Sequence, residues 1–370
     1  MIKTFKYDVI LDEADLCNRE AEKKRLISVI KRNGRIVLYS IRRMGKTSLT
    51  SVCSKILKKQ NPDTFYLYVD LNEVTSFGDV TKRFWAYFES ALKEQFPLQR
   101  AKSLMGNLIG RVKVHLPGKI ELSLDEIPES HHDMYLMELF KELGELSKTN
   151  PIIMTVDEFQ AIAHDRESQA ILRQAFQKLN LAGIVLMGSN QRLLYHMLND
   201  KSAPFFGFGE DLELTPISIE HYLPYLEDRF SKSNLLISKE VAIFMLDQMN
   251  NIPNYINELG AWLVDTMSNT ELTYHHIETA IYAAVHTKRG RYTSALYGYR
   301  PNEKKFFKAI AKKGFVESPT GKDMQELTDL SPSELLRVSR DMDDCPLISR
   351  DSQNRLFIID PFLQKFLMLF

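Results

Sequence analysis

Three consecutive residues, Gly45, Lys46 and Thr47, have the types and the order expected of a site that binds an anion. They follow an apolar run rich in β-forming residues, Arg35–Tyr39, and precede a segment, residues 47–58, whose apolar residues have helical spacing. A glycine lets the backbone approach an anion, a lysine supplies positive charge, and a helix N-terminus adds unpaired N–H groups. The order of strand, loop and helix therefore predicts a phosphate-binding loop, in which Lys46 reaches the β- and γ-phosphates and Thr47 offers its hydroxyl to Mg²⁺.

The loop departs from the pattern G-x-x-x-x-G-K-[ST] at its first position, where Ser40 stands in place of glycine. A side chain at this bend would adjust the shape of the loop or its affinity for phosphate. A Gly-Lys-Thr sequence can also follow a strand by chance, so a second motif is needed to decide. The residues expected to bind the nucleotide here are Ser40, Ile41, Arg42, Arg43, Met44, Gly45, Lys46, Thr47 and Ser48.

Two adjacent carboxylates, Asp157 and Glu158, end a second apolar run that begins at Pro151. Carboxylates also favour helix N-termini, so an Asp-Glu pair alone would fit a solvated helix start. Its place directly after a strand, in a chain that has the loop motif, favours a site at the carboxyl edge of a parallel sheet. We expect Asp157 to hold Mg²⁺, commonly through water, and Glu158 to act as the catalytic residue that activates the attacking water.

Two more strand-like runs complete an alternation of strands and helices. Gly183–Gly188 ends in Ser189 and Asn190, which would contact the γ-phosphate or position the water, with helix capping as the equal alternative. Phe65–Asp70 is a further strand with a polar end. The alternation predicts an α/β fold with a doubly wound parallel sheet.

The length and the charge of the chain limit the number of domains and the classes of partner to be expected. The 370 residues exceed one typical domain, and the net charge of zero provides no overall field that would draw the chain to nucleic acid or to a membrane. Residues 1–60 nevertheless hold 15 Lys and Arg against 6 Asp and Glu, which fits an anion site near the N-terminus. The three cysteines form no C-x-x-C pair, and no apolar run has the length of a signal peptide or membrane span, so we expect a cytoplasmic protein.

These motifs resemble those of archaeal-type P-loop ATPases of the STAND branch, relatives of the AAA+ and origin-recognition ATPases. Leu38–Leu49 is similar to the family's L-Y-G-P-R-R-x-G-K-T-S-L, and Cys17–Glu20 is similar to its F-x-x-R-E start, which packs near the adenine. Residues 187–190 resemble its G-S sensor strand, and residues 214–218 resemble its L-x-P-L-S segment before the lid. The resemblance implies ATP and Mg²⁺ as ligands and adds Arg19 to the expected nucleotide contacts.

The resemblance also implies how the chain is divided. We expect a P-loop ATPase domain, residues 1–216, with a β-hairpin insertion around residues 109–125 that uses the alternating segments on both sides of Pro117 and Gly118. A helical lid, a basic linker and a winged-helix domain are expected to follow, over residues 217–287, 288–300 and 301–370. The lid has no good strand pattern and predicts four helices, which begin near Ser218, Ser238, Pro253 and Thr273.

Two departures from the family pattern concern the rate of hydrolysis. Phe208 stands where the family commonly has an arginine, and the loss of that cation would weaken γ-phosphate sensing. Of the family's G-x-P turn near the lid only the proline is kept, so Pro253 is the expected contact near the nucleotide base. A slow or partner-regulated ATPase is therefore expected rather than a fast motor.

The C-terminal part carries two opposite indications about DNA. Lys288, Arg289 and Arg291 are interleaved with tyrosines, as in nucleic-acid contacts, although a packed joint between domains would have the same composition. The expected recognition helix, Ser333–Asp344, has two arginines against four carboxylates, which makes it a poor stand-alone DNA binder. The charge favours a protein-docking or autoinhibitory winged helix over one that binds DNA.

The leading hypothesis is a Mg-ATP-binding and hydrolysing conformational switch, with Lys46 and Glu158 as catalytic residues, that exchanges ATP and ADP and acts through a protein or DNA partner or by self-association. Two other hypotheses stay open. One is a nucleic-acid-binding winged-helix protein whose nucleotide site is slow or vestigial. The other is a partner-binding subunit of a defence or toxin–antitoxin-like complex.

Overall fold

The computed structural model describes residues 4–115, 129–179, 182–342, 345–351 and 353–370. The chain divides into two compact units that we describe separately. The sheet unit consists of residues 19–40 and 46–214, and the helical unit consists of the residues up to Asn18, residues 41–45 and residues 215–370. Among the described residues, no helix is both long and apolar enough to cross a bilayer.

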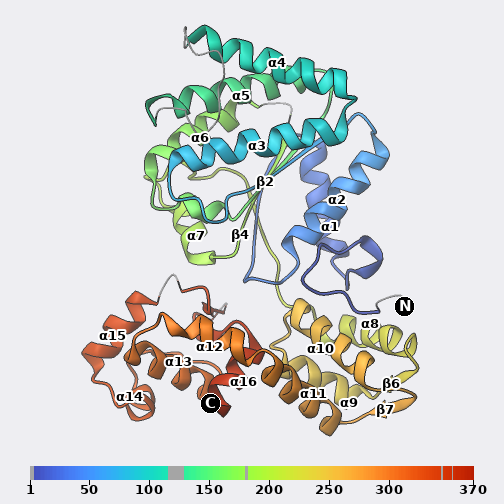
Figure 1. Cartoon of the computed structure of the whole chain (residues 1–370), viewed down its shortest axis with the longest axis vertical. Coiled ribbons are helices and arrows are strands. Elements are labelled where there is room, and N and C mark those ends of the chain that lie inside the picture. Colours follow the sequence, from blue (N-terminus) through green and yellow to red (C-terminus); the bar gives the residue numbers. More distant parts are fainter. Residues whose placement is uncertain (1–3, 116–128, 180–181, 343–344, 352) are drawn as a thin grey trace. The chain divides into compact units, whose positions relative to one another are not determined.

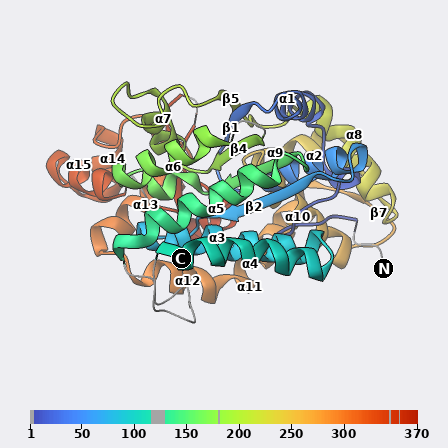
Figure 2. The same ribbon diagram turned by 90° about the horizontal axis from the view of Figure 1, so that it is seen from above.

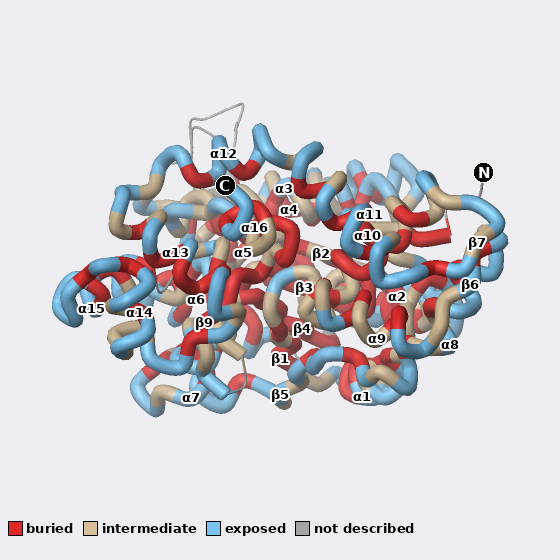
Figure 3. The backbone as a smooth tube through the Cα atoms, turned by 90° about the horizontal axis from the view of Figure 1, so that it is seen from below, coloured by how far each residue is buried: buried red, intermediate tan, exposed pale blue. Residues whose placement is uncertain are grey.

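The sheet unit, which contains helices α1 to α7 in Figure 1, is built on five parallel strands in the order β2-β3-β4-β1-β5, which confirms the predicted parallel sheet. Figure 3 shows the contrast between the buried central strands and the exposed edge strand β5, which the sequence analysis did not predict. The strands are β1 (Arg35–Tyr39), β2 (Phe65–Asp70), β3 (Ile152–Asp157), β4 (Ala182–Gly188) and β5 (Glu210–Glu213).

Helices cover both faces of this sheet, because alternate residues of the central strands are apolar on each side. Helices α1 (Glu20–Lys31) and α2 (Lys46–Gln60) pack on one face through residues such as Leu26 and Leu49. Figure 2 shows α1 on the opposite side of the sheet from α3 and α4. The helices that form the core of the second face, with α4 packed outside α3 and α5, are α3 (Phe77–Gln95), α4 (Leu98–His115), α5 (His132–Leu146), α6 (Arg166–Lys178) and α7 (Gln191–Asn199).

The prediction of a first strand for the hairpin insertion is wrong. Residues 98–115 form the helix α4, although Val112 and Val114 alternate with polar residues as in a strand. The buried residues Ala101, Leu108 and Val112 are spaced by seven and four, so they lie on one helical face, which packs against α3 and α5. The second strand, which was expected after Gly118, lies outside the described residues.

The four predicted lid helices are confirmed as α8 (Ile219–Ser231), α9 (Lys239–Gln248), α10 (Pro253–Thr266) and α11 (Tyr274–Thr287). Ser238 and Thr273 cap two of them by accepting hydrogen bonds from backbone N–H groups three residues later. Two short parallel strands, β6 (Leu235–Ile237) and β7 (Thr270–Leu272), were missed because three residues are too few to establish a pattern.

The C-terminal segment has three helices followed by an antiparallel hairpin and a last helix, as expected for a winged helix. The basic linker is largely helical, as α12. The elements are α12 (Arg289–Tyr297), α13 (Pro301–Lys313), α14 (Lys322–Thr328), α15 (Pro332–Asp341), β8 (Ile348–Arg350), β9 (Leu356–Ile358) and α16 (Pro361–Leu369).

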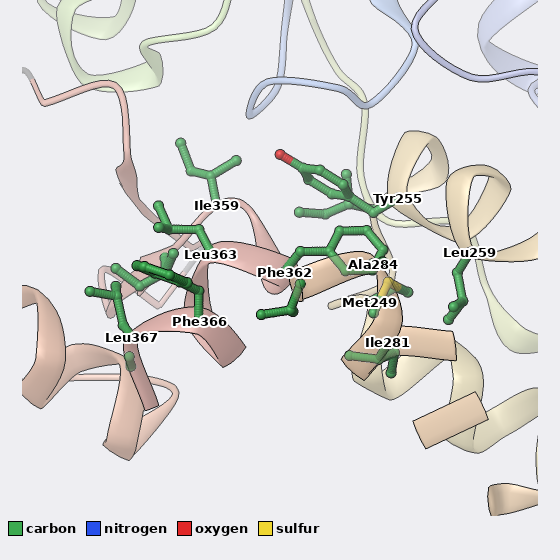
Figure 4. Packing of buried hydrophobic residues seen from close by; sticks show 14 of the residues in the cluster. Met249, Tyr255, Leu259, Ile281, Ala284, Ile359, Phe362, Leu363, Phe366 and Leu367 are labelled. Carbon is green, nitrogen blue, oxygen red and sulfur yellow. The ribbon is translucent and has the colours of Figure 1, made fainter. Parts of the chain in front are cut away.

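Lid and winged-helix residues share one apolar core within the helical unit. In Figure 4, Phe362 of α16 lies beside Tyr255 of α10 and Ala284 of α11. The ring centroids of Tyr255 and Phe362 are 6.1 Å apart, in an edge-to-face arrangement. The winged helix is therefore packed against the lid.

Candidate nucleotide site

In the sheet unit, Lys46 is the first residue of α2 and its ammonium group is turned back toward the end of β1. Its Nζ donates hydrogen bonds to the main-chain oxygen of Ser40 at 3.1 Å and to the Ser40 hydroxyl at 3.2 Å. Both residues are buried. The serine that replaces the pattern's first glycine therefore supplies an acceptor for Lys46 that a glycine would lack.

The turn before Lys46 depends on a glycine. Gly45 has φ +92°, a left-handed conformation in which any side chain is strained, although a Cβ there would meet no atom within 4 Å. Backbone strain, rather than lack of space, explains why glycine is required at this position. The structure thus gives this glycine a conformational role, whereas its predicted role, close approach of the backbone to phosphate, stays a prediction.

The second motif meets the first at the carboxyl ends of β1 and β3. Thr47 Oγ1 donates a hydrogen bond to Asp157 Oδ2 at 2.9 Å, and the Glu158 N–H donates to Asp157 Oδ1 at 2.9 Å. Burial raises the pKa of the Asp157 carboxyl above its usual value, although the hydrogen bonds from Glu158 and Thr47 oppose that shift. Lys46, Thr47 and Asp157 are thus brought together as predicted.

Glu158 is held by two donors on one oxygen. Its Oε2 accepts hydrogen bonds from Ser189 Oγ at 2.9 Å and from Gln160 Nε2. Gln160 also accepts from the Ser189 N–H at 3.3 Å, so the three residues form one network. The backbone of Glu158 has φ +50°, a strained conformation that non-glycine residues adopt mainly where the surroundings impose it.

The other expected contacts divide between chemical and structural roles. Asn190 caps α7 by accepting from the Leu193 N–H at 3.1 Å, which is the capping alternative for this residue, whereas Ser189 contacts Glu158. Arg19 lies just before α1, is buried, and forms an ion pair with Glu22 at 2.7 Å. Ser48 is buried in the first turn of α2.

The donor atoms at this edge of the sheet fit Mg²⁺. Thr47 and Asp157 supply hydroxyl and carboxylate oxygens, the hard ligands that Mg²⁺ prefers, and their side chains are already in contact. Among the described residues, no group of three or more His, Cys, Asp and Glu side chains could hold a metal by itself. A metal here would depend on oxygens from phosphate and water, as is usual for Mg²⁺ in nucleotide sites.

Two residues in contact with the site were not assigned from the sequence. Gln160 follows Glu158 by two residues, and Tyr68 of β2 donates its hydroxyl to Asp157 Oδ2 at 3.0 Å. Tyr68 could have been found from its position, since it is a polar aromatic residue near the end of a strand that pairs with β3. The bond to Asp157 Oδ2 could not have been found from the sequence, because it depends on the geometry of side chains on two strands.

In the helical unit, the tip of the loop, residues 41–45, packs with the N-terminal segment and with the lid. Met44 is buried in the apolar core of this unit. Arg43 forms an ion pair with Asp8, and its guanidinium lies 5.0 Å from the ring centroid of Tyr255. Asp8 is in turn held by reciprocal hydrogen bonds with Asn254, at 2.8 Å and 3.0 Å.

The N-terminal segment is anchored on the lid helices. Arg229 of α8 donates to the main-chain oxygen of Thr4 and forms an ion pair with Asp15, both at 3.0 Å. Asn257 of α10 donates to the main-chain oxygen of Lys6 at 2.8 Å. These bonds hold the segment that carries Asp8. Pro253, the expected base contact, is the first residue of α10 and directly precedes Asn254.

Phe208 is a core residue of the sheet unit. It packs against Phe176 and Phe205, with centroid distances of 5.7 Å and 5.1 Å. The guanidinium groups of Arg35 and Arg173 lie 5.1 Å and 5.0 Å from its ring centroid. An arginine at this position would be buried between two other cations, so the departure from the family pattern follows from this packing.

Two of the three possible nucleic-acid contacts are engaged within the helical unit. Lys288 forms an ion pair with Glu258 at 2.6 Å and lies 4.1 Å from the ring centroid of Phe362. Arg289 stacks on Phe370 at 4.7 Å, whereas Arg291 is exposed. These contacts have the character of a packed joint, the alternative that the composition also allowed.

A groove of about 640 Å³ lies between α4 and α5 of the sheet unit. Its lining includes Arg100, Asn107, Arg111 and Glu142 and none of the predicted site residues. Arg111 is paired with Glu142 in this groove. The groove is thus separate from the phosphate loop and from Asp157.

The sequence matches no family model and no curated protein. Among solved structures, the Walker-type ATPase Paby2304 of Pyrococcus abyssi matches with a TM-score of 0.68 and 18% identity, over 99% of this chain and 100% of that chain. The ORC2 protein of Aeropyrum pernix, solved as ADPNP-ADP complexes, matches with a TM-score of 0.57 and 13% identity, over 99% and 96%. The ORC1 protein of Aeropyrum pernix, solved in complex with DNA, matches with a TM-score of 0.53 and 14% identity, over 95% and 92%. The chain therefore has the fold of the AAA+-like P-loop ATPases.

Proposed function

We propose that this chain is a Mg-ATP-binding and hydrolysing conformational switch of the AAA+/STAND type, which acts through a protein or DNA partner. The observation that carries the proposal is the 2.9 Å hydrogen bond between Thr47 and Asp157, with Lys46 and Glu158 next to them in the chain. It joins a phosphate-loop hydroxyl to a strand-end carboxylate in a P-loop fold. That combination is the usual means by which such folds bind a triphosphate and its metal.

In this proposal, Lys46 binds the β- and γ-phosphates, and the Thr47 hydroxyl and the Asp157 carboxylate hold Mg²⁺. When bound, the metal would supply positive charge that neutralises the phosphates. Gly45 gives the loop the turn it needs, and the N–H groups at the start of α2 add further donors. Lys46 donates to the Ser40 hydroxyl, which therefore competes with phosphate for one of its donors.

Glu158 is the proposed general base, which accepts a proton from the attacking water. Ser189 and Gln160 both donate hydrogen bonds to its Oε2 and so compete with water for that oxygen. Slow or partner-regulated hydrolysis is supported by two features. Glu158 already accepts two donors on one oxygen, and Phe208 occupies, within the core, the position where the related ATPases commonly have an arginine.

The switch is supported by the contacts of the loop tip within the helical unit. Arg43 contacts Asp8 of the N-terminal segment and Tyr255 of the lid, and Tyr255 packs on Phe362 of the last helix. Residues 41–45 are continuous in the chain with Lys46. A movement of the loop on nucleotide binding would therefore change the contacts of the lid, and through Phe362 those of the winged helix.

Two substitutions test binding and hydrolysis. We expect Lys46→Ala to abolish ATP binding, and Glu158→Gln to bind ATP but to hydrolyse it at least about 100-fold more slowly, the usual loss without a general base. Lys58→Ala on the same helix and Glu145→Gln on α5 are matched controls that should retain both properties. Titration calorimetry and phosphate release provide the measurements. Tight ATP binding by Lys46→Ala would contradict the proposal.

Hydrogen exchange tests the switch. In the Glu158→Gln background, saturating Mg-ATP should change the exchange protection at the start of α10, residues 253–256, because Tyr255 contacts the loop tip. Adding Arg43→Ala should abolish that change, whereas Lys239→Ala, at an exposed position of α9 in the same unit, should leave it. If the change persists without the Arg43 side chain, this route between loop and lid is wrong.

DNA binding by the winged helix is a second candidate, which the likeness to the DNA-bound ORC1 protein favours. The exposed Arg291 and the surface of α15 would be its contacts, but α15 carries carboxylates as well as arginines. Binding to duplex DNA without ATP, weakened by salt and by Arg291→Ala, would support this candidate. Absence of such binding at low salt would leave a protein partner or self-association as the means of action.

A further inference from the structure

Asp157 has a third hydrogen-bond donor that belongs to neither motif. Tyr68 Oη donates to Asp157 Oδ2 at 3.0 Å, and the same oxygen accepts from Thr47 Oγ1 at 2.9 Å. The other oxygen, Oδ1, accepts from the Glu158 N–H at 2.9 Å. The carboxylate is buried, with 6% of the residue exposed, and these three bonds are the described hydrogen bonds of its two oxygens.

The position of the Tyr68 hydroxyl is determined by the sheet and by α3. Strand β2 pairs in parallel with β3, with Tyr68 opposite Thr155 and Asp70 opposite Asp157. The ring of Tyr68 packs edge-to-face on Tyr87 of α3, with centroids 6.0 Å apart. The phenol of a tyrosine carries its proton at neutral pH, so the Tyr68 hydroxyl is a donor to the carboxylate.

The lone pairs of the carboxylate show what this donor does. Each carboxylate oxygen can accept about two hydrogen bonds. Thr47 and Tyr68 together occupy Oδ2, and Glu158 occupies one position on Oδ1. One acceptor position on Oδ1 is then left for a metal or a water bound to it. Without Tyr68, Oδ2 would regain a free position and the carboxylate would lose a donor that limits its rotation.

We propose that Tyr68 is a positioning residue for the metal site, because its hydroxyl fixes Asp157 in the orientation that binds Mg²⁺ together with Thr47. The inference rests on the proposed function, since the orientation of Asp157 matters for a metal only if the chain binds Mg-nucleotide. The hydrogen bonds that orient metal-binding carboxylates commonly contribute about tenfold to metal affinity.

The chain offers a matched control on the same strand. Tyr66 lies two residues before Tyr68, so its side chain is on the same face of the sheet. Its phenol lies near Thr155, Ser54 and Thr50, and none of the described hydrogen bonds joins its hydroxyl to Asp157. Tyr68→Phe and Tyr66→Phe therefore remove the same atom from neighbouring positions, and only the first removes a bond to Asp157.

The experiment measures the affinity for ADP in EDTA and across a series of Mg²⁺ concentrations, by titration calorimetry with the full chain. We expect Tyr68→Phe to raise the half-saturating Mg²⁺ concentration about tenfold and to leave the ADP affinity in EDTA unchanged. Tyr66→Phe should match the wild type in both. Binding of Mn²⁺ in the presence of ADP can be measured directly by electron paramagnetic resonance. Tyr68→Phe should bind Mn²⁺ more weakly than the wild type, and Tyr66→Phe should bind it as the wild type does.

Four outcomes would overturn the inference. If Tyr68→Phe and Tyr66→Phe have equal Mg²⁺ dependence, the bond to Asp157 does not position the metal ligand. If Tyr68→Phe weakens ADP binding equally in EDTA and in Mg²⁺, the role of Tyr68 is structural. If the wild type binds ADP without any effect of Mg²⁺, the metal site itself is wrong, and if it binds no nucleotide, the proposed function fails as well.

Discussion

Replacing Ser40 with alanine should tighten ATP binding. The Lys46 ammonium group donates to the main-chain oxygen of Ser40 at 3.1 Å and to its hydroxyl at 3.2 Å. An ammonium group has three donors, and two of them are used in these bonds to Ser40. The main-chain acceptor persists in every variant, whereas the hydroxyl competes with phosphate. Removing the hydroxyl removes this competition, so we expect Lys46 to bind the phosphates more tightly.

The expected size follows from the net value of one hydrogen bond. A buried intramolecular bond is worth about 1 kcal/mol after exchange with its alternatives, which corresponds to about a fivefold change in affinity. We therefore expect Ser40→Ala to lower the dissociation constant of ATP about fivefold. AMP, which has no β- or γ-phosphate, should bind Ser40→Ala and the wild type equally.

Titration calorimetry with Mg-ATP and with AMP provides the assay. Ser40→Gly removes the same hydroxyl but frees the backbone, at a stability cost of about 0.5–1 kcal/mol, so it separates the two effects. Ser54→Ala is the control, since Ser54 is buried on α2, the helix that begins at Lys46, and donates to the Thr50 main-chain oxygen at 2.9 Å. If Ser40→Ala binds ATP more weakly than the wild type, the hydroxyl holds Lys46 in its binding position, and the competition argument is refuted.

Two further substitutions address the hydrolysis step and the core. Gln160→Ala should raise the basal rate of ATP hydrolysis about fivefold at unchanged ATP affinity, because Glu158 loses one of two donors on Oε2. A slower rate in a phosphate-release assay would mean that Gln160 supports the active orientation instead. Phe208→Ala should lower the free energy of unfolding by about 3–5 kcal/mol, the usual loss for a buried phenylalanine. A loss below about 1 kcal/mol in urea unfolding would contradict the core role.

The main site residues could be predicted because their positions follow from local patterns and one rule of topology. Gly45, Lys46 and Thr47 form a contiguous motif, and Asp157 and Glu158 end a buried strand. Parallel strands bring their carboxyl ends to the same edge of the sheet, so the two motifs had to approach each other. The hydrogen bond between Thr47 and Asp157 is the direct result.

Contacts that depend on side-chain geometry could not be predicted in this way. The bond from Tyr68 to Asp157 requires the order of β2 and β3 in the sheet, their register and the tyrosine rotamer. The ion pair between Arg43 and Asp8 joins segments that no periodicity relates. The sequence predicts which residue types lie at the ends of elements, but it does not predict which distant partner each one meets.

Two of the errors of secondary structure, at α4 and at β5, have different physical causes. Residues 111–115 alternate like a strand, but α4 can bury Val112 and Leu108 on one face against α3 and α5, so packing decided for a helix. Strand β5, with the sequence Glu-Asp-Leu-Glu, has no apolar pattern because it is an exposed edge held by its pairing with β1. In both segments the structure is determined by contacts with other elements, namely α3 and α5 for α4 and β1 for β5, rather than by the local sequence.

The described site groups are already engaged with the protein before any ligand is considered. Lys46 is bonded to Ser40, Glu158 to Ser189 and Gln160, and Arg43 to Asp8. An enzyme selected for speed has donors and acceptors that are oriented toward the reacting atoms in advance, so that little reorganisation accompanies the reaction. In the proposed ATPase each step of binding and hydrolysis would instead exchange one protein contact for another. A partner could stabilise either the contact within the protein or the contact with the ligand. It would then change the affinity for ATP or the rate of hydrolysis, which is why we expect hydrolysis to depend on a partner.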